Sequence, residues 1–201
     1  MAYSLEFHEP LRIAEWVAYD VTRREIMQSH VERTNDFRED PLLGQNSPED
    51  DDYKGSGYDR GHLAPAADMA YSADAMSESF YMANMTPQHK GLNRGRWKSL
   101  ETQVRKWAIE RDSLWVVSGP VLRDGLASLP SGIAIPEYFF KAIYDPEPVP
   151  AAIGYLFPNE KCSQPLEAYA VSLDELEALT GMDLFPGLEE RLEQTVALSE
   201  W

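Results

Sequence analysis

Apolar and polar residues alternate through residues 15–21, which is the period of a strand with one buried face. Three later runs combine β-branched and aromatic residues and are bounded by proline or glycine: residues 114–122, 138–144 and 151–157. Short apolar runs of this kind are typical of strands inside a sheet. The pattern therefore predicts a central antiparallel sheet that contains these segments.

A helix is predicted over residues 94–111, because apolar residues recur there at helical spacing and basic residues lie outside the apolar stripe. The stripe consists of Trp97, Leu100, Val104, Trp107 and Ala108. One face of this helix should pack on the core while the other faces solvent. Trp97 is expected to serve core packing.

Two further helices are predicted near the end of the chain. Ser172 is followed three residues later by Glu175, the spacing of a capping box, and Gly181 offers a stop, so a short helix should cover residues 173–180. A last amphipathic segment covers residues 188–198. The order of strands and helices predicts an α+β fold with a central antiparallel sheet flanked by helices.

Length and composition set the broad class. The 201 residues, of which 43% are hydrophobic, suffice for one core, so a single domain over residues 1–201 is expected. No run of eighteen apolar residues occurs, and Glu6, His8 and Glu9 lie where a signal peptide needs an apolar stretch. We therefore expect no membrane segment and no export signal. Cys162 is the only cysteine, which excludes an intrachain disulfide.

The formal net charge of −16 argues against a nucleic-acid enzyme at first, because phosphate binding normally needs a basic surface. The charge is unevenly distributed, however: residues 36–52 and 159–201 are strongly acidic, whereas residues 86–111 hold only two acids, Glu101 and Glu110. The basic residues of that segment are Lys90, Arg94, Arg96, Lys98, Arg105, Lys106 and Arg111. A basic face on an acidic body is therefore predicted.

Residues 35–57 collect prolines, glycines and acids, which is typical of a long surface loop. Its acidic residues 49–52 are interpreted as solvated side chains without a chemical role.

The densest group of reactive side chains is Tyr-Asp-Arg-Gly-His at residues 58–62. In an extended segment Arg60 and His62 share one face, while Asp59 points to the other. A neutral imidazole can take a proton from water, and a guanidinium can stabilise charge that develops on a phosphate. Together these groups suit the hydrolysis of a phosphodiester.

Asn93 and Glu101 could hold the hard cation that such a reaction needs. They are eight residues apart on the predicted helix, about two turns, so the amide oxygen and the carboxylate should fall near one face. Oxygen ligands with several retained waters suit magnesium, whereas zinc needs histidine or cysteine ligands that are not clustered in this sequence. A hydrated magnesium ion is therefore predicted.

Three motifs stand in order along the chain: Gly-Tyr-Asp-Arg-Gly-His-Leu-Ala-Pro-Ala at residues 57–66, Asn-Met-Thr-Pro-Gln at residues 84–88, and Leu-Asn-Arg-Gly-Arg-Trp at residues 92–97, followed by Glu101. With these motifs the chain resembles the DNA/RNA nonspecific endonuclease family, which has the ββα-metal (His-Me finger) fold and includes secreted bacterial nucleases and mitochondrial endonuclease G. Residues 116–120 and 170–186 fit as well, so the resemblance extends from about Glu15 onward.

The resemblance implies a role for each matching residue. His62 would be the general base that activates water, and Asn93 the direct protein ligand of a magnesium ion otherwise coordinated by water and substrate oxygens. Glu101 would hold one metal-bound water, Arg60 would stabilise the transition state, and Asn84 would orient His62 or the bound phosphate. The resemblance also implies cleavage of DNA and RNA to 5′-phosphate products, with Mn²⁺ as a candidate substitute for Mg²⁺.

Several residues keep two interpretations. Asp59 could have a structural hydrogen-bonding role or a catalytic one. Arg94 and Arg96 are candidates for binding substrate phosphates, although a basic solvent-facing surface is the commoner meaning of such residues on a helix. Arg23 and Arg24 are further candidates for the same groove.

The ββα unit is expected to consist of the strand that ends at His62, a strand near residues 80–82 and the helix after Asn93. Three different classes of protein stay open beside the nuclease. An acidic nucleic-acid mimic or inhibitor protein would suit the net charge but gives no reason for the ordered motifs. A catalytically silent binding relative and a phosphodiesterase for smaller substrates complete the set.

DNA and RNA are the expected substrates, and a homodimer through the apolar C-terminal residues Leu198 and Trp201 is a candidate assembly. An uninhibited nonspecific nuclease would destroy the nucleic acids of its host. We therefore expect a secreted or periplasmic location, or confinement to an organelle, with the targeting segment absent from this chain, or else a dedicated inhibitor protein.

Overall fold

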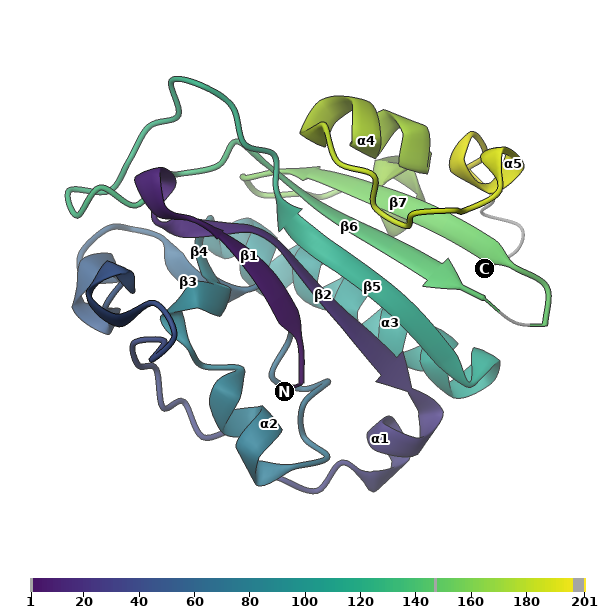
Figure 1. Cartoon of the computed structure of the whole chain (residues 1–201), viewed down its shortest axis with the longest axis horizontal. Helices are drawn as coiled ribbons and strands as arrows, with labels where there is room; N and C mark the ends of the chain where they lie inside the picture. The colour runs from purple at the N-terminus through teal and green to yellow at the C-terminus, as the bar shows by residue number, and fades with distance from the viewer. Residues whose placement is uncertain (1, 147, 197–200) are drawn as a thin grey trace.

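The computed structural model describes residues 2–146, 148–196 and 201, and its largest element is a six-stranded antiparallel sheet in the order β1-β2-β5-β6-β7-β8 (Figure 1). Its strands are β1 Ser4–His8, β2 Ile13–Thr22, β5 Ser113–Pro120, β6 Tyr138–Asp145, β7 Ala151–Pro158 and β8 Ala170–Val171. The strands predicted at residues 15–21, 114–122, 138–144 and 151–157 are confirmed, as is their antiparallel pairing.

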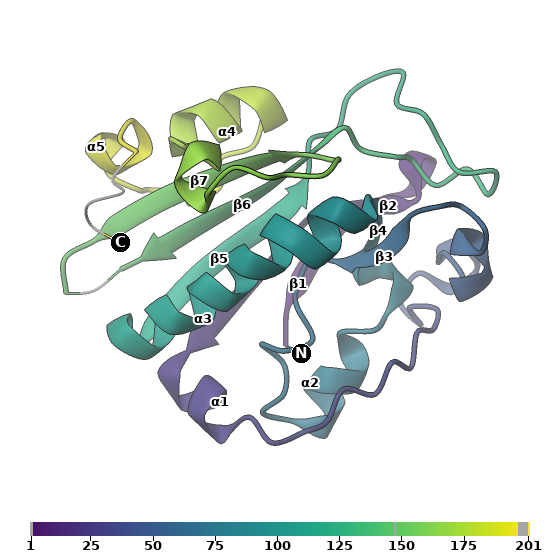
Figure 2. The ribbon, with the colours of Figure 1, turned by 180° about the vertical axis from the view of Figure 1, so that it is seen from behind.

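Helices cover both faces of the large sheet. Helix α3 (Lys98–Arg111) crosses one face, and α4 (Leu173–Thr180) and α5 (Glu190–Glu193) lie on the other (Figure 1, Figure 2). Strand β6 therefore buries alternate residues on opposite sides: Phe139 packs beneath α3, and Phe140 packs beneath α4. Burial on both faces explains why the central strands are nearly continuous apolar runs.

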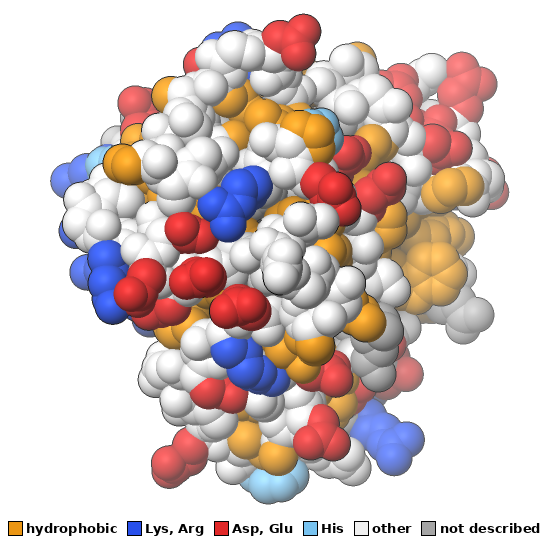
Figure 3. Space-filling model, turned by 60° about the vertical axis from the view of Figure 1, so that its left-hand side comes forward, with side chains coloured by type: hydrophobic (Ala, Val, Ile, Leu, Met, Phe, Trp, Pro, Cys, Tyr) orange, Lys and Arg blue, Asp and Glu red, His pale blue; other side chains and the backbone are white. Residues whose placement is uncertain are grey.

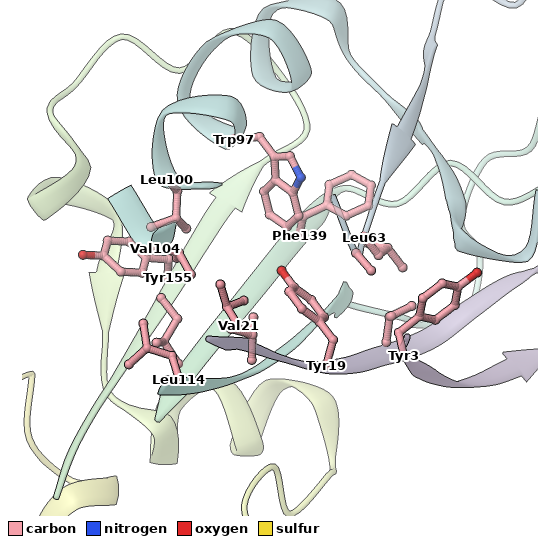
Figure 4. Close-up of a cluster of buried hydrophobic side chains, with 14 of the residues drawn as sticks. Tyr3, Tyr19, Val21, Leu63, Trp97, Leu100, Val104, Leu114, Phe139 and Tyr155 are labelled. Carbon is pink, nitrogen blue, oxygen red and sulfur yellow. The ribbon is translucent and has the colours of Figure 1, made fainter. Parts of the chain in front are cut away.

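The core between α3 and the sheet fixes the start of that helix. Figure 4 shows Leu100 and Val104 of α3 above Val21 of β2, with Trp97 next to Phe139. The ring centroids of Trp97 and Phe139 are 5.8 Å apart, and Trp97 is buried, as its place in the apolar stripe predicts. The residues around Trp97 are therefore held on a rigid part of the molecule.

The helix predicted over residues 94–111 begins later than expected. Residues Leu92–Trp97 form a short π-helical segment, η5, in which Gly95 has non-helical backbone angles (φ −107°, ψ −112°), and α3 itself begins at Lys98. Asn93 therefore lies before the kink rather than on α3. The prediction of one regular helix from Arg94 is wrong, because a glycine inside the apolar pattern interrupts the helix without interrupting the pattern.

A separate two-stranded sheet pairs β3 (Asp59–His62) with β4 (Met85–Gln88). The strand predicted near residues 80–82 is wrong: helix α2 (Ala73–Glu78) ends just before Phe80, and Met82–Asn84 form a 3₁₀ turn. Phe80 and Met82 are fully buried, so their apolar character reflects packing in a turn rather than strand pairing.

Of the two helices predicted near the end of the chain, the first is present as expected and the second is much shorter than expected. Helix α4 spans the predicted residues 173–180, with the Ser172 side chain accepting the Glu175 N–H and Gly181 in the left-handed conformation. In the described part of the amphipathic segment, residues 188–196, the structure shows only the short helix α5, and Leu198 lies outside the described residues. Helix α1 spans Arg23–Gln28, directly after β2. No helix in the described ranges is long and apolar enough to cross a membrane.

Candidate active site

A cleft of about 480 Å³ opens where β3, the chain that follows it and the start of α3 meet. His62 and Arg60 reach it from β3, where alternation places them on one face as predicted. Asn93 reaches it from η5 and Glu101 from α3. The fold thus brings together four of the residues singled out in the sequence, from three separate segments.

His62 sits in an apolar part of the cleft. The residue is 7% exposed, and its imidazole makes edge contacts with Phe37 and Phe80, at centroid distances of 5.9 and 5.0 Å. Burial, helped by the nearby charges of Arg33 and Arg60, lowers the pKa of His62 to about 3. Its Nε2 is buried and has no hydrogen-bond partner among the described residues. The ring is therefore neutral near pH 7, and one of its nitrogens is not committed to a hydrogen bond with any described residue.

Asn84 lies behind the cleft and is fully buried. Its amide oxygen accepts the N–H of Ala64 at 2.9 Å, and its amide nitrogen donates to the carbonyls of Ala64 and Ser79, each at 2.9 Å. Two of these three bonds engage the backbone at Ala64, two residues after His62, and none of them reaches the imidazole. In this geometry Asn84 acts on His62 through the main chain, whereas contact with a phosphate would need an exposed side chain.

Asp59 fixes the orientation of Asn93. The Asn93 Nδ2 donates to Asp59 Oδ2 at 3.0 Å, and Arg94 grips the same carboxylate with two bonds of 2.7 Å. Burial alone would raise the pKa of the Asp59 carboxyl group, but these hydrogen bonds outweigh burial and lower the pKa below its usual value. Because the amide nitrogen of Asn93 is committed to Asp59, its oxygen is the atom left for a cation. The structural interpretation of Asp59 is therefore the one that its contacts favour.

Glu101 is the acid of the cleft. Burial raises the pKa of its carboxyl group, and the Lys141 ammonium below it opposes that rise. No group of three or more His, Cys, Asp or Glu that could hold a metal occurs in the described part of the chain. A cation bound here would have the Asn93 and Glu101 oxygens plus waters, a donor set that suits a hard, hydrated ion such as Mg²⁺.

Five cationic side chains line the cleft with Glu101: Arg33, Arg60, Arg94, Lys98 and Arg105. Neither Arg33 nor Lys98 forms an ion pair with any residue that the structure describes, whereas Arg105 pairs with buried Asp68 at 2.7 Å. Sequence reasoning missed Arg33, which comes from an irregular segment without a motif. The position of Arg105 in the cleft could have been inferred from the sequence, because Arg105 follows Glu101 by one helical turn and so lies on the same face of the helix.

Two of the acidic residues 49–52 in the loop form ion pairs with arginines, which the sequence does not suggest. Asp50 forms an ion pair with Arg60, and Asp52 pairs with Arg12 at 3.1 Å. The prediction that residues 49–52 are simply solvated is therefore wrong for these two acids. Arg60 also stacks its guanidinium over Phe37, 4.1 Å from the ring centroid, so its position in the cleft is held from two sides.

The other basic residues that are candidates for binding substrate phosphates do not all lie in the cleft. Arg94 lines the cleft, but Arg96 donates to the Ser163 carbonyl at 3.1 Å and is not among the residues lining the cleft. Arg23 donates to the carbonyls of Ile109 and Glu110 at the far end of α3. On the face shown in Figure 3, acidic and basic side chains are interspersed, in keeping with the net charge.

The chain matches known nucleases over most of its length. A family model described as DNA/RNA non-specific endonuclease matches residues 1–191. Mitochondrial nuclease EXOG of Homo sapiens is 32% identical over 206 residues, which cover 93% of this chain and 56% of that protein. Mitochondrial endonuclease G of Homo sapiens is 30% identical over 210 residues, or 94% and 69%. The chain thus spans little more than half the length of EXOG.

Similarity extends to three dimensions. A crystal structure described as the EndoG/EndoGI complex, solved to explain EndoG inhibition, superposes with a TM-score of 0.86 at 27% sequence identity. The superposition covers 95% of this chain and 86% of that one.

Proposed function

Because the chain belongs to the DNA/RNA non-specific endonuclease family, we propose that it is a divalent-metal-dependent endonuclease that hydrolyses DNA and RNA without base selectivity. The observation that carries this proposal is the neutral, buried imidazole of His62 in a cleft that also holds the Asn93 amide, the Glu101 carboxylate and several guanidinium groups. That combination supplies a proton acceptor, oxygen ligands for a cation and positive charge for a phosphate.

The reaction proceeds by attack of water on the scissile phosphorus. His62 takes a proton from the water through an unprotonated ring nitrogen, and the new P–O bond forms as the bond to the 3′ oxygen breaks. The products are a 5′-phosphate and a 3′-hydroxyl, with the 3′ oxygen taking up a proton as it leaves. Arg60 stabilises the charge that builds on the phosphoryl oxygens.

A divalent cation held by Asn93, and by Glu101 through water, would neutralise the phosphate and the leaving oxygen. Mg²⁺ is the proposed ion, and Mn²⁺ is a candidate substitute. Asp59 and Asn84 serve as positioning residues, for Asn93 and for the backbone after His62 respectively. Arg94 and Arg96 are proposed to contact flanking phosphates, Arg94 at the cleft and Arg96 outside it.

The test compares the wild-type protein with His62→Ala on supercoiled plasmid and total RNA, with Mg²⁺ and with excess EDTA. His30→Ala is a matched control, because His30 is exposed and does not line the cleft. We expect wild type and control to degrade both substrates only with metal, and His62→Ala to lose cleavage. Mass spectrometry of the fragments should find 5′-phosphate ends.

Different results would favour a different class of protein. Tight binding of a nucleic-acid-binding protein, without cleavage in any divalent metal, would identify an acidic mimic. Binding of nucleic acid with no turnover would identify a silent relative, and cleavage confined to small phosphodiesters would limit the substrate class.

We also propose that the protein is kept away from the nucleic acids of its host, by secretion, by confinement in an organelle or by an inhibitor protein. The mitochondrial names of two relatives support organelle confinement, and the EndoG/EndoGI complex supports an inhibitor. A homodimer is a further candidate. Fractionation of the native source and size-exclusion chromatography test location and assembly.

A further inference from the structure

We propose that Lys141 is a positioning residue for this catalytic centre: from the middle of the large sheet, its ammonium group hydrogen-bonds the backbone that follows His62 and holds the imidazole in place. This role rests on the proposed function, because it concerns the same reaction.

Lys141 is a fully buried lysine on a strand whose neighbouring residues on the same face are apolar. It lies on β6 between Phe139 and Ile143, both of which belong to the core beneath α3. Its ammonium group lies 4.8 Å from the centre of the Trp97 ring. A buried ammonium is unfavourable unless it is paired, so its partners indicate why the fold keeps it.

The two hydrogen bonds of Lys141 join the sheet to the segment after β3. Its Nζ donates to the Tyr19 hydroxyl at 3.0 Å and to the Leu63 carbonyl at 3.3 Å. Figure 4 shows the Tyr19 hydroxyl rising from β2 toward Trp97, with Leu63 to one side. Leu63 directly follows His62, so the ammonium group is linked to the base through a single residue of main chain.

Three successive carbonyls, starting with that of the last residue of β3, each receive a side-chain donor from a different element. Trp97 Nε1 donates to His62 at 3.1 Å, Lys141 Nζ to Leu63 at 3.3 Å, and Asn84 Nδ2 to Ala64 at 2.9 Å. We call these three bonds the carbonyl clamp. Main-chain pairing beyond β3 continues for one more bond, from the Leu63 N–H to the Asn84 carbonyl at 3.1 Å, and the clamp adds side-chain donors to the carbonyls of the chain that leaves the base.

Charge gives Lys141 a second link to the site. The charged groups that face it are Glu101 and Asp68, which favour its charged form, and Arg105, which opposes it. Lys141 in turn favours the charged form of Glu101. A neutral side chain at this position would break the bond to Leu63 and would also leave two buried carboxylates with one cation fewer.

The test replaces Lys141 by methionine, which keeps the length of the side chain but removes the donor and the charge. Ile143→Ala is the matched control, because Ile143 lies two residues along β6 on the same buried face and has no part in the clamp. With an oligonucleotide substrate, we expect Lys141→Met to lower kcat by at least about tenfold while KM changes by less than about threefold. The control should lower the melting temperature and leave kcat unchanged well below it.

A second readout follows the base directly. In ¹⁵N-histidine spectra, the ring signals of His62 should move in Lys141→Met and stay in place in Ile143→Ala. If Lys141→Met does not fold, Tyr19→Phe takes its place, because it removes one acceptor and keeps the charge; it too should move the His62 signals and lower kcat.

Wild-type kcat together with unmoved His62 signals, in a folded variant at position 141 or in Tyr19→Phe, would overturn the role of Lys141. Absence of cleavage by the wild-type protein in every divalent metal would instead overturn the proposed function. In that case the His62 signals alone decide whether the clamp positions the ring.

Discussion

Asn93 can present only one of its two amide heteroatoms to a cation, because its nitrogen donates to Asp59 at 3.0 Å. A free asparagine side chain can turn either its amide oxygen or its amide nitrogen toward a cation. The bond to Asp59 fixes the orientation in which the oxygen is available before the cation binds. Partners of this kind often decide how well a metal ligand works.

Replacement of Asp59 by alanine should therefore weaken metal binding by roughly 10- to 100-fold, because the Asn93 amide is no longer oriented. Isothermal titration with Mn²⁺ measures the affinity. Asp51→Ala is the control: it removes the same charge from an exposed site whose partner is Lys54. Equal Mn²⁺ affinity in wild type and Asp59→Ala would show that Asn93 orients itself.

The buried imidazole makes stability depend on pH. Its folded-state pKa is lowered to about 3 from the ordinary value of 6.5. Between these two pH values the imidazole is therefore protonated in the unfolded chain and neutral in the folded protein. Stability from this group is complete above about pH 6.5 and is lost progressively as the pH falls toward 3. Between pH 7.5 and pH 5 the loss should be about 2 kcal/mol, at about 1.36 kcal/mol per pKa unit.

Urea denaturation in EDTA at the two pH values measures this effect, with His62→Asn as the reference protein. The free energy of unfolding of wild type should fall about 2 kcal/mol further than that of the variant. Equal losses of unfolding free energy in both proteins would mean that the pKa of His62 is not lowered in the folded state.

At the level of elements, the side chain of Gln88 on β4 fills the space beside Gly61 on β3, which favours glycine at that position. A Cβ atom on Gly61 would lie 2.3 Å from the side chain of Gln88, which is itself fully buried. The residue between Arg60 and His62 is thus set by packing across the pair of strands, and not by chemistry in the cleft.

Gly61→Ala should destabilise the protein by about 1 to 3 kcal/mol through overpacking. The same change in a Gln88→Ala background should cost far less, because the clashing side chain is gone. A double-mutant cycle from thermal or urea unfolding measures the coupling between the two positions. Additive losses would show that Gly61 is needed for some reason other than Gln88.

Elements with a clear period or a clear cap could be predicted from the sequence, and elements shaped by tertiary contacts could not. The four central strands and helix α4 are predictable because their apolar runs and caps are local signals. The strand expected at residues 80–82 is wrong because a buried turn and a strand have the same apolar composition. The kink at Gly95 escapes prediction because the apolar stripe continues through it.

The site was predictable to the extent that it resides in motifs. His62, Arg60, Asn93 and Glu101 lie in or beside the three motifs, and the fold gathers them in one cleft. Lys141 stands in an apolar run, where a single lysine is easily taken for an exposed residue. Only the fold shows that its partners are Leu63 and Tyr19, more than seventy residues earlier in the chain.

At the level of the whole molecule, a net charge of −16 coexists with a cleft rich in arginine and lysine. Affinity for nucleic acid should therefore come from a few local cations and fall with salt in proportion to the number of phosphates that they contact. Lys98 is one of them, since it lines the cleft and has no ion pair in the part of the chain that the structure describes.

Lys98→Ala should reduce the slope of log affinity against log salt by about 1, because one phosphate contact is lost. Binding of labelled DNA by the inactive His62→Ala protein, from about 50 to about 200 mM NaCl, gives the slope. Lys54→Ala is the control, because Lys54 is exposed, paired with Asp51 and remote from the cleft lining. An unchanged slope for Lys98→Ala would remove Lys98 from the binding surface.

The pairing of β3 with β4 forms a sheet of its own, outside the ladder of the six-stranded sheet. Opening four paired residues breaks far fewer backbone bonds than melting the large sheet. Strand β4 is fully buried, however, and the carbonyl clamp ties the end of β3 to Trp97, Lys141 and Asn84, so the pair should open only together with the large sheet. Activity and the circular dichroism signal should therefore be lost at the same temperature on heating, and activity that disappears while the signal persists would show that the pair of strands opens first.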